Sequence, residues 1–312
     1  ENAKSGHPGM TMGIAEVVTI LFAKHLRFNP ENPEWKNRDR FILSAGHGSM
    51  LMYSLLYLLG YPKISMDHIK SFRKVNSPAA GHPEFGELPG IETTTGPLGQ
   101  GLGNGLGMAI SEKIIRQRYG ENVFNHYTYI LAGDGCLMEG ISHEFASLAG
   151  HLNLSNLTLI YDDNKISIDG PTSLTMSDNT LERFNALGWH TTSIDGYNLE
   201  EVDSALTNAK LDPRPSLISC QTLIGYGAPN KQNTAGSHGA PLGEEEIQMA
   251  KKNMKWNYDK FVLPEQVKKD WEEIGKRNIE LSKEWEKQNS LTLNNIKKIN
   301  DELLNNIECG KN

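Results

Sequence analysis

Apolar and polar residues in the first third of the chain alternate between helical spacing and short strand-like runs. In residues 12–26 the apolar positions recur three and four residues apart, which predicts a helix entered from the turn-rich segment 5–9. The apolar run at 40–45 predicts a strand, and the apolar segment 49–59 predicts the helix that follows it. Residues 77–96 are rich in Pro, Gly and Thr and predict a long loop.

From residue 127 onward, strand-like and helical segments alternate. The expected strands are 127–132, 157–161, 190–194 and 216–223, and the expected helices between them are 142–152, 179–187 and 199–209. This alternation is typical of a doubly wound parallel α/β sheet with helices on both faces. Ligands of such sheets bind at the carboxyl ends of the strands, so residues directly after the strands are the first candidates for chemistry.

The pattern changes beyond Gly243. From residue 244 the chain is rich in Lys, Glu and Asn and shows no further strand pattern. We therefore expect one domain over 1–243 and a helical extension over 244–312 that wraps the core or leads toward a further module.

Composition and charge exclude several classes of protein. With 38% hydrophobic residues and 30 glycines in 312 positions, the chain is neither disordered nor fibrous. A net charge of −7 argues against nucleic acid or an anionic membrane surface as the main partner. No apolar run approaches a membrane span, and no signal segment opens the chain. Cys136, Cys220 and Cys309 are widely spaced and odd in number, which favours a reducing, cytoplasmic location over a disulfide framework.

The first constellation of possible chemical importance is Gly133-Asp134-Gly135, at the end of an expected strand. Asn164 follows the next strand, and the 28 residues between the two motifs suffice for one helical crossover. Carboxylate and amide oxygens are hard ligands, suited to Mg²⁺ or Ca²⁺ held together with a phosphate group. The flanking glycines permit close approach of a diphosphate, and the following helix offers its N-terminus to an anion. Alternatively, the tripeptide is only a turn from strand to helix.

A glycine-rich helix is expected to begin near Gly99. Its glycines do not satisfy the GxGxxG spacing of a nicotinamide-binding turn. On a helix, Gly99, Gly103 and Gly107 share one face and Gly101 and Gly105 another, so neighbours can approach the backbone on two sides. Close helix packing alone explains such a pattern equally well.

Four of the ten histidines stand beside glycines in expected loops or turns: His7, His47, His82 and His238. Imidazoles in such positions suit proton transfer and hydrogen bonding near neutral pH. The spacings HxxxH and HExxH are absent, which argues against a zinc site. The other six histidines lie in or beside expected elements and are interpreted as structural.

Taken together, these motifs resemble a known family. The GDG motif followed at this spacing by Asn resembles a thiamin diphosphate-binding motif, and SGHPG, SAGHGS, ETTTGPLGQG, YDDNKISIDG and SHGAPLG resemble transketolase. The resemblance runs from Ser5 to Gly243. Dihydroxyacetone synthase is a close alternative, distinguished by accepting formaldehyde.

The resemblance implies a thiamin diphosphate-binding fold that holds the cofactor with Mg²⁺ or Ca²⁺. The activity it implies is transfer of a two-carbon ketol unit between sugar phosphates of the pentose phosphate pathway. It also implies individual roles. By this resemblance the metal ligands are Asp134, Asn164 and the carbonyl of Ile166. The residues that contact the cofactor are His47, Gly96, Leu98, Asp134, Gly135, Glu139, Asn164, Ile168 and His238. The catalytic residues are His7, His47, His82 and His238. Glu139 resembles the glutamate that joins a carboxylate network between paired active sites.

This chain is much shorter than the members of the family it resembles. A transketolase is about twice as long, and its second domain supplies the groups around the aminopyrimidine ring. We therefore expect a homodimer, or a partner subunit or domain that supplies the pyrimidine-binding half. The chain begins at Glu1, directly before the first motif, and is interpreted as a fragment lacking a preceding helix, or as one subunit of a split enzyme. Isolated, it is expected to expose an apolar face near Leu98 and residues 101–107. A catalytically silent cofactor-binding module is the alternative function.

Overall fold

The computed structural model describes residues 1–308, and Cys309 lies outside the described residues. Its centre is a parallel sheet in the order β1-β2-β3-β7-β6. The strands are β1 (Arg40–Leu43), β2 (Thr128–Gly133), β3 (Leu157–Asp163), β6 (His190–Asp195) and β7 (Ser216–Gln221). All five predicted strands are confirmed, and every residue of central β3 is buried because both faces of the sheet are covered.

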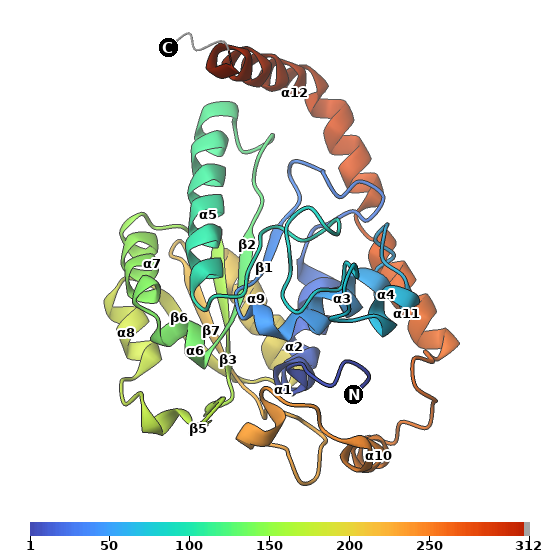
Figure 1. Cartoon of the computed structure of the whole chain (residues 1–312). Coiled ribbons are helices and arrows are strands. Elements are labelled where there is room, and N and C mark those ends of the chain that lie inside the picture. Colours follow the sequence, from blue (N-terminus) through green and yellow to red (C-terminus); the bar gives the residue numbers. More distant parts are fainter. Residues whose placement is uncertain (309–312) are drawn as a thin grey trace.

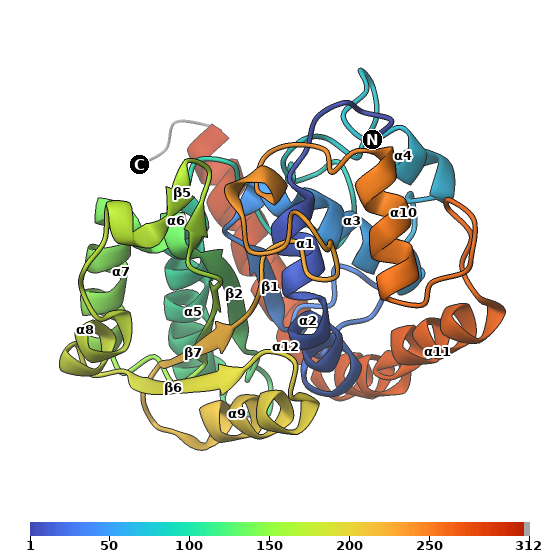
Figure 2. The ribbon, with the colours of Figure 1, turned by 90° about the horizontal axis from the view of Figure 1, so that it is seen from below.

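Helices cover both faces of the sheet, as the alternation predicts. Helices α5, α7 and α8 lie on one face and α2 and α9 on the other (Figure 2). The helices are α1 (Pro8–Gly13), α2 (Ala15–Ile20), α3 (Ser49–Leu58), α4 (Met66–Lys70), α5 (Gln100–Tyr119), α6 (Asp134–Met138), α7 (Gly140–His151), α8 (Thr180–Ala186), α9 (Leu199–Leu211), α10 (Glu244–Asn253), α11 (Glu265–Lys276) and α12 (Ile279–Glu308). Two short strands, β4 (Ile166–Ser167) and β5 (Gly170–Pro171), pair antiparallel in a small ribbon that was not expected from the sequence.

The single helix predicted over 12–26 is wrong. The segment begins earlier, breaks at Ile14 between α1 and α2, and ends in a π-helical turn, Leu21–His25. The reason is a close approach of the chain to α1: a Cβ on Gly9 would lie 2.5 Å from the Ser237 carbonyl oxygen, and one on Gly13 would lie 2.8 Å from that of Leu223. Helix α1 is thereby seated against the loop that carries His238.

The glycines of α5 are used on two sides, as their spacing predicts. A Cβ on Gly101 would lie 2.6 Å from Ser44 Cα, and one on Gly105 would lie 2.4 Å from Ile130, so this face lies directly on the sheet. A Cβ on Gly103 would meet only Ile141 at 3.8 Å, whereas Gly107 has nothing within 4 Å. The expected exposed face is therefore only partly correct: Leu98 is exposed, but Gly101 and Gly105 are buried.

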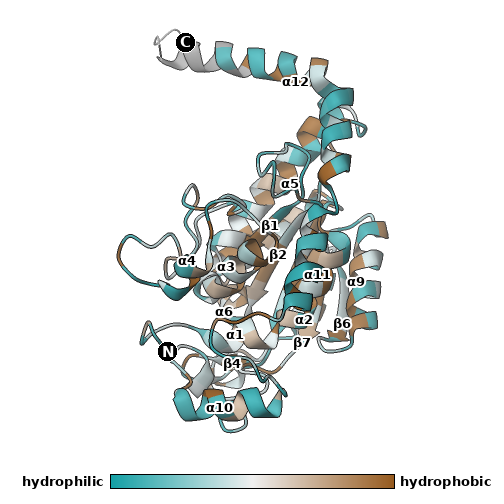
Figure 3. Cartoon of the chain, turned by 90° about the vertical axis from the view of Figure 1, so that its right-hand side faces the viewer, coloured by the Kyte–Doolittle hydropathy of each residue, from teal (hydrophilic) through white to brown (hydrophobic). Residues whose placement is uncertain are grey.

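The C-terminal helices lie against the domain as well as extending from it. Helix α12 is anchored by Trp285, whose ring packs on Trp35 and Phe124, and it then runs away from the sheet (Figure 1). A groove of about 1090 Å³ separates α12 from α5. In Figure 3, hydrophilic residues predominate in α10 and in the coloured part of α12.

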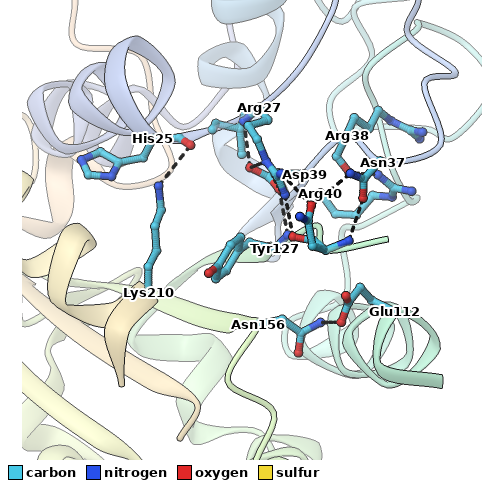
Figure 4. A network of polar contacts seen from close by, with 12 residues as sticks. His25, Arg27, Asn37, Arg38, Asp39, Arg40, Glu112, Tyr127, Asn156 and Lys210 are labelled. Carbon is cyan, nitrogen blue, oxygen red and sulfur yellow. Dashed lines mark hydrogen bonds and ion pairs between the residues drawn. The ribbon is translucent and has the colours of Figure 1, made fainter. Parts of the chain in front are cut away.

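A polar network ties the amino ends of the strands together (Figure 4). The Arg27 guanidinium donates to Asp39 at 2.9 Å and to the carbonyl of Asn125 at 2.6 Å, and Asp39 also accepts from the backbone N–H of Tyr127 at 2.8 Å. Asp39 is buried, and burying it without these partners would cost several kcal/mol. This edge is closed by structural contacts, whereas the predicted site residues follow the opposite ends of the strands.

Candidate functional site

The carboxyl ends of the strands lie at the lower edge of the sheet in Figure 1, near α1 and α6. There the loop 77–99 is fastened to the end of β1: the Thr95 hydroxyl donates to the Leu43 carbonyl at 2.8 Å. A Cβ on Gly46 would lie 2.8 Å from the Gly96 nitrogen, so only glycine fits this contact. The packing brings the loops of His47 and Gly96 together.

Three of the four candidate histidines converge at this edge. The ring centroids of His7 and His47 are 4.9 Å apart, those of His47 and His238 are 5.3 Å apart, and those of His7 and His238 are 5.9 Å apart. His238 is more than 190 positions from either of the other two in the sequence, and it reaches them because α1 packs on the loop that carries it. We call His7, His47 and His238 the histidine cluster.

His82 lies beside the cluster on the loop 77–99. Its ring would be 3.4 Å from a Cβ on Gly96. Its backbone is fixed from α3, since the Ser49 hydroxyl donates to the Gly81 carbonyl at 2.9 Å and the Tyr53 hydroxyl to the His82 carbonyl at 3.2 Å. The ring itself is left available for a ligand.

Burial keeps these imidazoles uncharged near neutral pH. It lowers the pKa of His7 to about 4 and that of His47 to about 3, with smaller contributions from neighbouring imidazoles. Burial also lowers the pKa values of His82 and His238. A neutral imidazole carries one donor and one acceptor nitrogen, so each ring can both give a hydrogen bond to a hydroxyl group and accept one.

Asp134 is the first residue of α6, directly after β2, and is 3% exposed. The hydroxyl of Tyr161 donates to its Oδ1 at 2.5 Å, while its Oδ2 has no hydrogen-bond partner among residues 1–308. Burial raises the pKa of Asp134 to about 6, against the opposing hydrogen bond from Tyr161. A buried carboxylate with one free oxygen is suited to a cation.

Asn164 directly follows β3, the strand beside β2 in the sheet. Its Oδ1 accepts from the backbone N–H of Ile166 at 3.0 Å, which closes a tight turn into the β4–β5 ribbon. Ile168 lies on that ribbon and is 59% exposed. A Cβ on Gly239 would be 3.3 Å from both Ile168 Cδ1 and His7 Nε2, so the ribbon reaches the histidine cluster.

The remaining predicted residues border the same edge. A Cβ on Gly135 would meet Leu98 Cδ1 at 2.8 Å, which places these two residues in contact. Glu139 is the exposed residue before α7. A Cβ added to Gly99 would lie 3.0 Å from the Cβ of Glu139, so these two residues are neighbours. The fold thus brings every predicted site residue to the carboxyl edge of the sheet.

The donor set at Asp134 fits a hard cation with a phosphate ligand. Within residues 1–308, no three His, Cys, Asp or Glu side chains are grouped so that they could hold a metal ion. An ion at Asp134 would therefore take its other ligands from the Asn164 amide oxygen, the Ile166 carbonyl and oxygens of the ligand itself. Gly133 has no atom within 4 Å of an added Cβ, so a diphosphate has room beside it.

Arg73 borders the site but is not among the candidate residues that the sequence predicts. Its guanidinium has no hydrogen-bond or ion-pair partner within the described chain, and its backbone is left-handed with φ of 61°. The guanidinium lies against Gly81, since a Cβ there would be 3.0 Å from Nε, and its charge contributes to the lowered pKa values of His7 and His82. Nothing in its local sequence distinguishes it from a surface arginine.

Comparisons with known proteins agree on one family. Residues 1–310 match the family model described as transketolase, thiamine diphosphate binding domain. A transketolase of Buchnera aphidicola subsp. Acyrthosiphon pisum is 50% identical over 98% of this chain and 47% of its own length, and one of Cereibacter sphaeroides is 50% identical over 92% and 44%. A crystal structure of transketolase from Campylobacter jejuni superposes with a TM-score of 0.89 at 42% identity, covering 92% of this chain and 45% of that one. The chain thus spans less than half the length of these relatives.

Proposed function

Because this chain belongs to the transketolase family, and matches its thiamine diphosphate-binding domain, we propose that it forms the diphosphate- and metal-binding half of a transketolase active site. The observation that carries the proposal is the meeting of the histidine cluster with the Asp134 and Asn164 turns at one edge of the sheet. The complete enzyme would transfer a two-carbon ketol unit from a ketose phosphate to an aldose phosphate.

The cofactor half of the site is assigned to the turns after β2 and β3. Asp134, Asn164 and the Ile166 carbonyl would hold Mg²⁺ or Ca²⁺ against the diphosphate, since their oxygens suit a hard ion. Gly96, Leu98, Gly135 and Ile168 would contact the cofactor through backbone and apolar surface. When bound, thiamin diphosphate supplies the carbon that carries the two-carbon unit.

The substrate half of the site is assigned to the imidazoles. His47 and His238 would lie against the diphosphate and the reacting centre, and His7 and His82 would hydrogen-bond substrate hydroxyls and take up or release their protons. The lowered pKa values of His7 and His82 support the hydrogen-bonding role, because a neutral imidazole can donate one hydrogen bond and accept another. Glu139 would face a second active site across an interface.

The remaining parts of the proposal concern assembly and location. Sugar phosphates would be the substrates, and a second copy or a partner domain would supply the pyrimidine-binding half and form a dimer. We retain a domain boundary near Gly243. This glycine has a positive φ of 91°, and α10 begins at the next residue. Cys136 and Cys220 are both free and buried, which supports a reducing cytoplasmic compartment. No helix within residues 1–308 is long and apolar enough to cross a membrane.

The test is cofactor binding by the Asp134→Ala variant. Without the carboxylate, the ion loses its one anionic protein ligand, so the variant is expected to bind thiamin diphosphate with Mg²⁺ or Ca²⁺ at least about 100-fold more weakly than wild type. Titration calorimetry with each ion measures the effect, and Asp195→Asn, an exposed acid at the end of β6, is the control. Unchanged affinity of Asp134→Ala would remove the assignment of this turn.

A further inference from the structure

A second buried carboxylate lies directly behind the proposed metal ligands. Asp162 is fully buried near the end of β3, between Gly133 of β2 and Cys220 of β7. Its Oδ2 accepts from the Asn164 side-chain amide at 3.0 Å, and its Oδ1 accepts from the hydroxyl of Thr222. Both oxygens are therefore engaged by groups that belong to the carboxyl edge.

This contact decides which way the Asn164 amide faces. An amide side chain has an oxygen that accepts and an NH₂ group that donates, and a carboxylate can only accept. Asp162 therefore binds the NH₂ group of Asn164 and turns its carbonyl oxygen toward Ile166, whose N–H donates to it at 3.0 Å. The carbonyl oxygen retains a second lone pair for an ion.

Thr222 in turn holds Asp162. It is 7% exposed in the segment after β7, and its methyl group is confined by Gly196, where a Cβ would lie 2.8 Å from Thr222 Cγ2. Its hydroxyl is the hydrogen-bond donor to Asp162 Oδ1. A chain of contacts thus runs from β7 through Thr222 and Asp162 to Asn164.

We propose that Asp162, held by Thr222, is a positioning residue that fixes the Asn164 amide with its oxygen toward the divalent cation and the diphosphate. The inference rests on the proposed function and adds residues to which the family resemblance assigned no role. Groups that orient metal ligands in this way commonly change metal affinity by about 10–100-fold when they are replaced.

The experiment measures Mg²⁺ affinity in the presence of thiamin diphosphate, by titration calorimetry on the full chain in mildly alkaline buffer. Asp162→Asn keeps the shape but offers one acceptor oxygen instead of two, and its NH₂ group can pair with the Asn164 oxygen and turn that amide around. Its Mg²⁺ affinity is expected to fall about 10–100-fold.

A pair of variants at Thr222 separates positioning from general structure. Thr222→Val removes the hydroxyl and keeps the volume, so Mg²⁺ binding should weaken by about tenfold, whereas Thr222→Ser keeps the hydroxyl and should stay within about twofold of wild type. Thr158→Val is the matched control, because Thr158 is a buried threonine of β3 near the opposite edge. It should also leave Mg²⁺ binding within about twofold.

Thermal unfolding without ions shows whether each variant is folded, and the Thr222 variants carry the test if Asp162→Asn does not fold. Unchanged Mg²⁺ affinity in folded Asp162→Asn, or equal losses in Thr222→Ser and Thr222→Val, would overturn the inference and leave the proposed function standing. Failure of the wild-type chain to bind Mg²⁺ with thiamin diphosphate would overturn both.

Discussion

The glycine-flanked histidines differ in their surroundings although their local sequences are alike. Three of them form a cluster with ring centroids within 6 Å, while His82 approaches from a separate loop. Burial makes the largest contribution to the lowered pKa of each, and Arg73 adds to it only for His7 and His82. Arg73 therefore acts on the two imidazoles proposed to meet substrate.

Replacing Arg73 should change these two imidazoles selectively. In Arg73→Gln the pKa values of His7 and His82 are expected to rise, because a positive charge no longer opposes protonation. Histidine resonances followed by NMR during a pH titration measure this, and His238 should not move. Lys74→Gln, which removes an exposed neighbouring charge, is the control. A uniform shift of all four imidazoles would contradict the assignment.

The burial of His126 makes the folding stability of the chain depend on pH. It is 4% exposed, and burial together with Arg40 and other arginines lowers its pKa to about 2. Between the unfolded pKa of 6.5 and the folded value, the unfolded chain binds a proton that the folded chain does not, so folding stability falls as the pH falls through this range. One such proton contributes up to about 1.4 kcal/mol per pH unit.

His126→Gln should therefore lose less stability than wild type on acidification below the unfolded pKa. Urea unfolding at a series of pH values measures the slope. His151→Gln, a change at an exposed position of α7, should keep the wild-type slope. If stability changed with pH at the same slope in all three proteins, His126 would bind its proton equally in the folded and unfolded chain, and this prediction would be wrong.

At the scale of elements, α5 depends on glycine at some positions and not at others. Gly101 lies against the Ser44 backbone, which cannot move aside, whereas Gly107 is exposed with nothing within 4 Å of an added Cβ. The two positions belong to the same helix and have the same local composition. Only contact with the sheet distinguishes them.

Alanine substitutions should therefore have opposite signs along α5. Gly101→Ala is expected to destabilise the fold by about 1–3 kcal/mol through overpacking. Gly107→Ala is expected to stabilise it by roughly 0.5–1 kcal/mol, because alanine is the better helix former. Denaturant unfolding of the two variants measures both effects. Stabilisation by Gly101→Ala would mean that α5 does not lie on β1 as described.

At the scale of the whole molecule, the chain covers less than half of the relatives it matches. Around its site, apolar side chains remain exposed, among them Leu98 at 36%, Ile141 at 39% and Ile168 at 59%. Exposed apolar side chains beside a site are expected where a partner surface covers them. These residues border the edge at which the proposed second half would complete the site.

We expect the isolated chain to have no transketolase activity. Activation of the cofactor needs a group at its aminopyrimidine ring, which the proposal places on the other half. Addition of a separately expressed pyrimidine-binding half should restore ketol transfer and saturate near a one-to-one ratio. A coupled assay measures this, with mass spectrometry to verify that the isolated chain contains no second half. Ketol transfer by the chain alone would contradict this division of the site.

The sequence by itself determined the class of fold and the chemistry of the candidate residues. Strand and helix periods depend on neighbouring residues, so the five strands and their parallel arrangement followed from local patterns. The motifs around His7, Asp134 and Asn164 likewise carried the family resemblance, because each lies within a few consecutive residues.

Only the tertiary structure decided what depends on segments far apart in the chain. The break at Ile14 exists because a distant loop reaches Gly9 and Gly13, and no pattern within residues 12–26 records that contact. The partners of Asp162 and the position of Arg73 are decided in the same way, by strand order and by loop anchoring. Local sequence specifies which groups are present, and long-range packing specifies which groups meet.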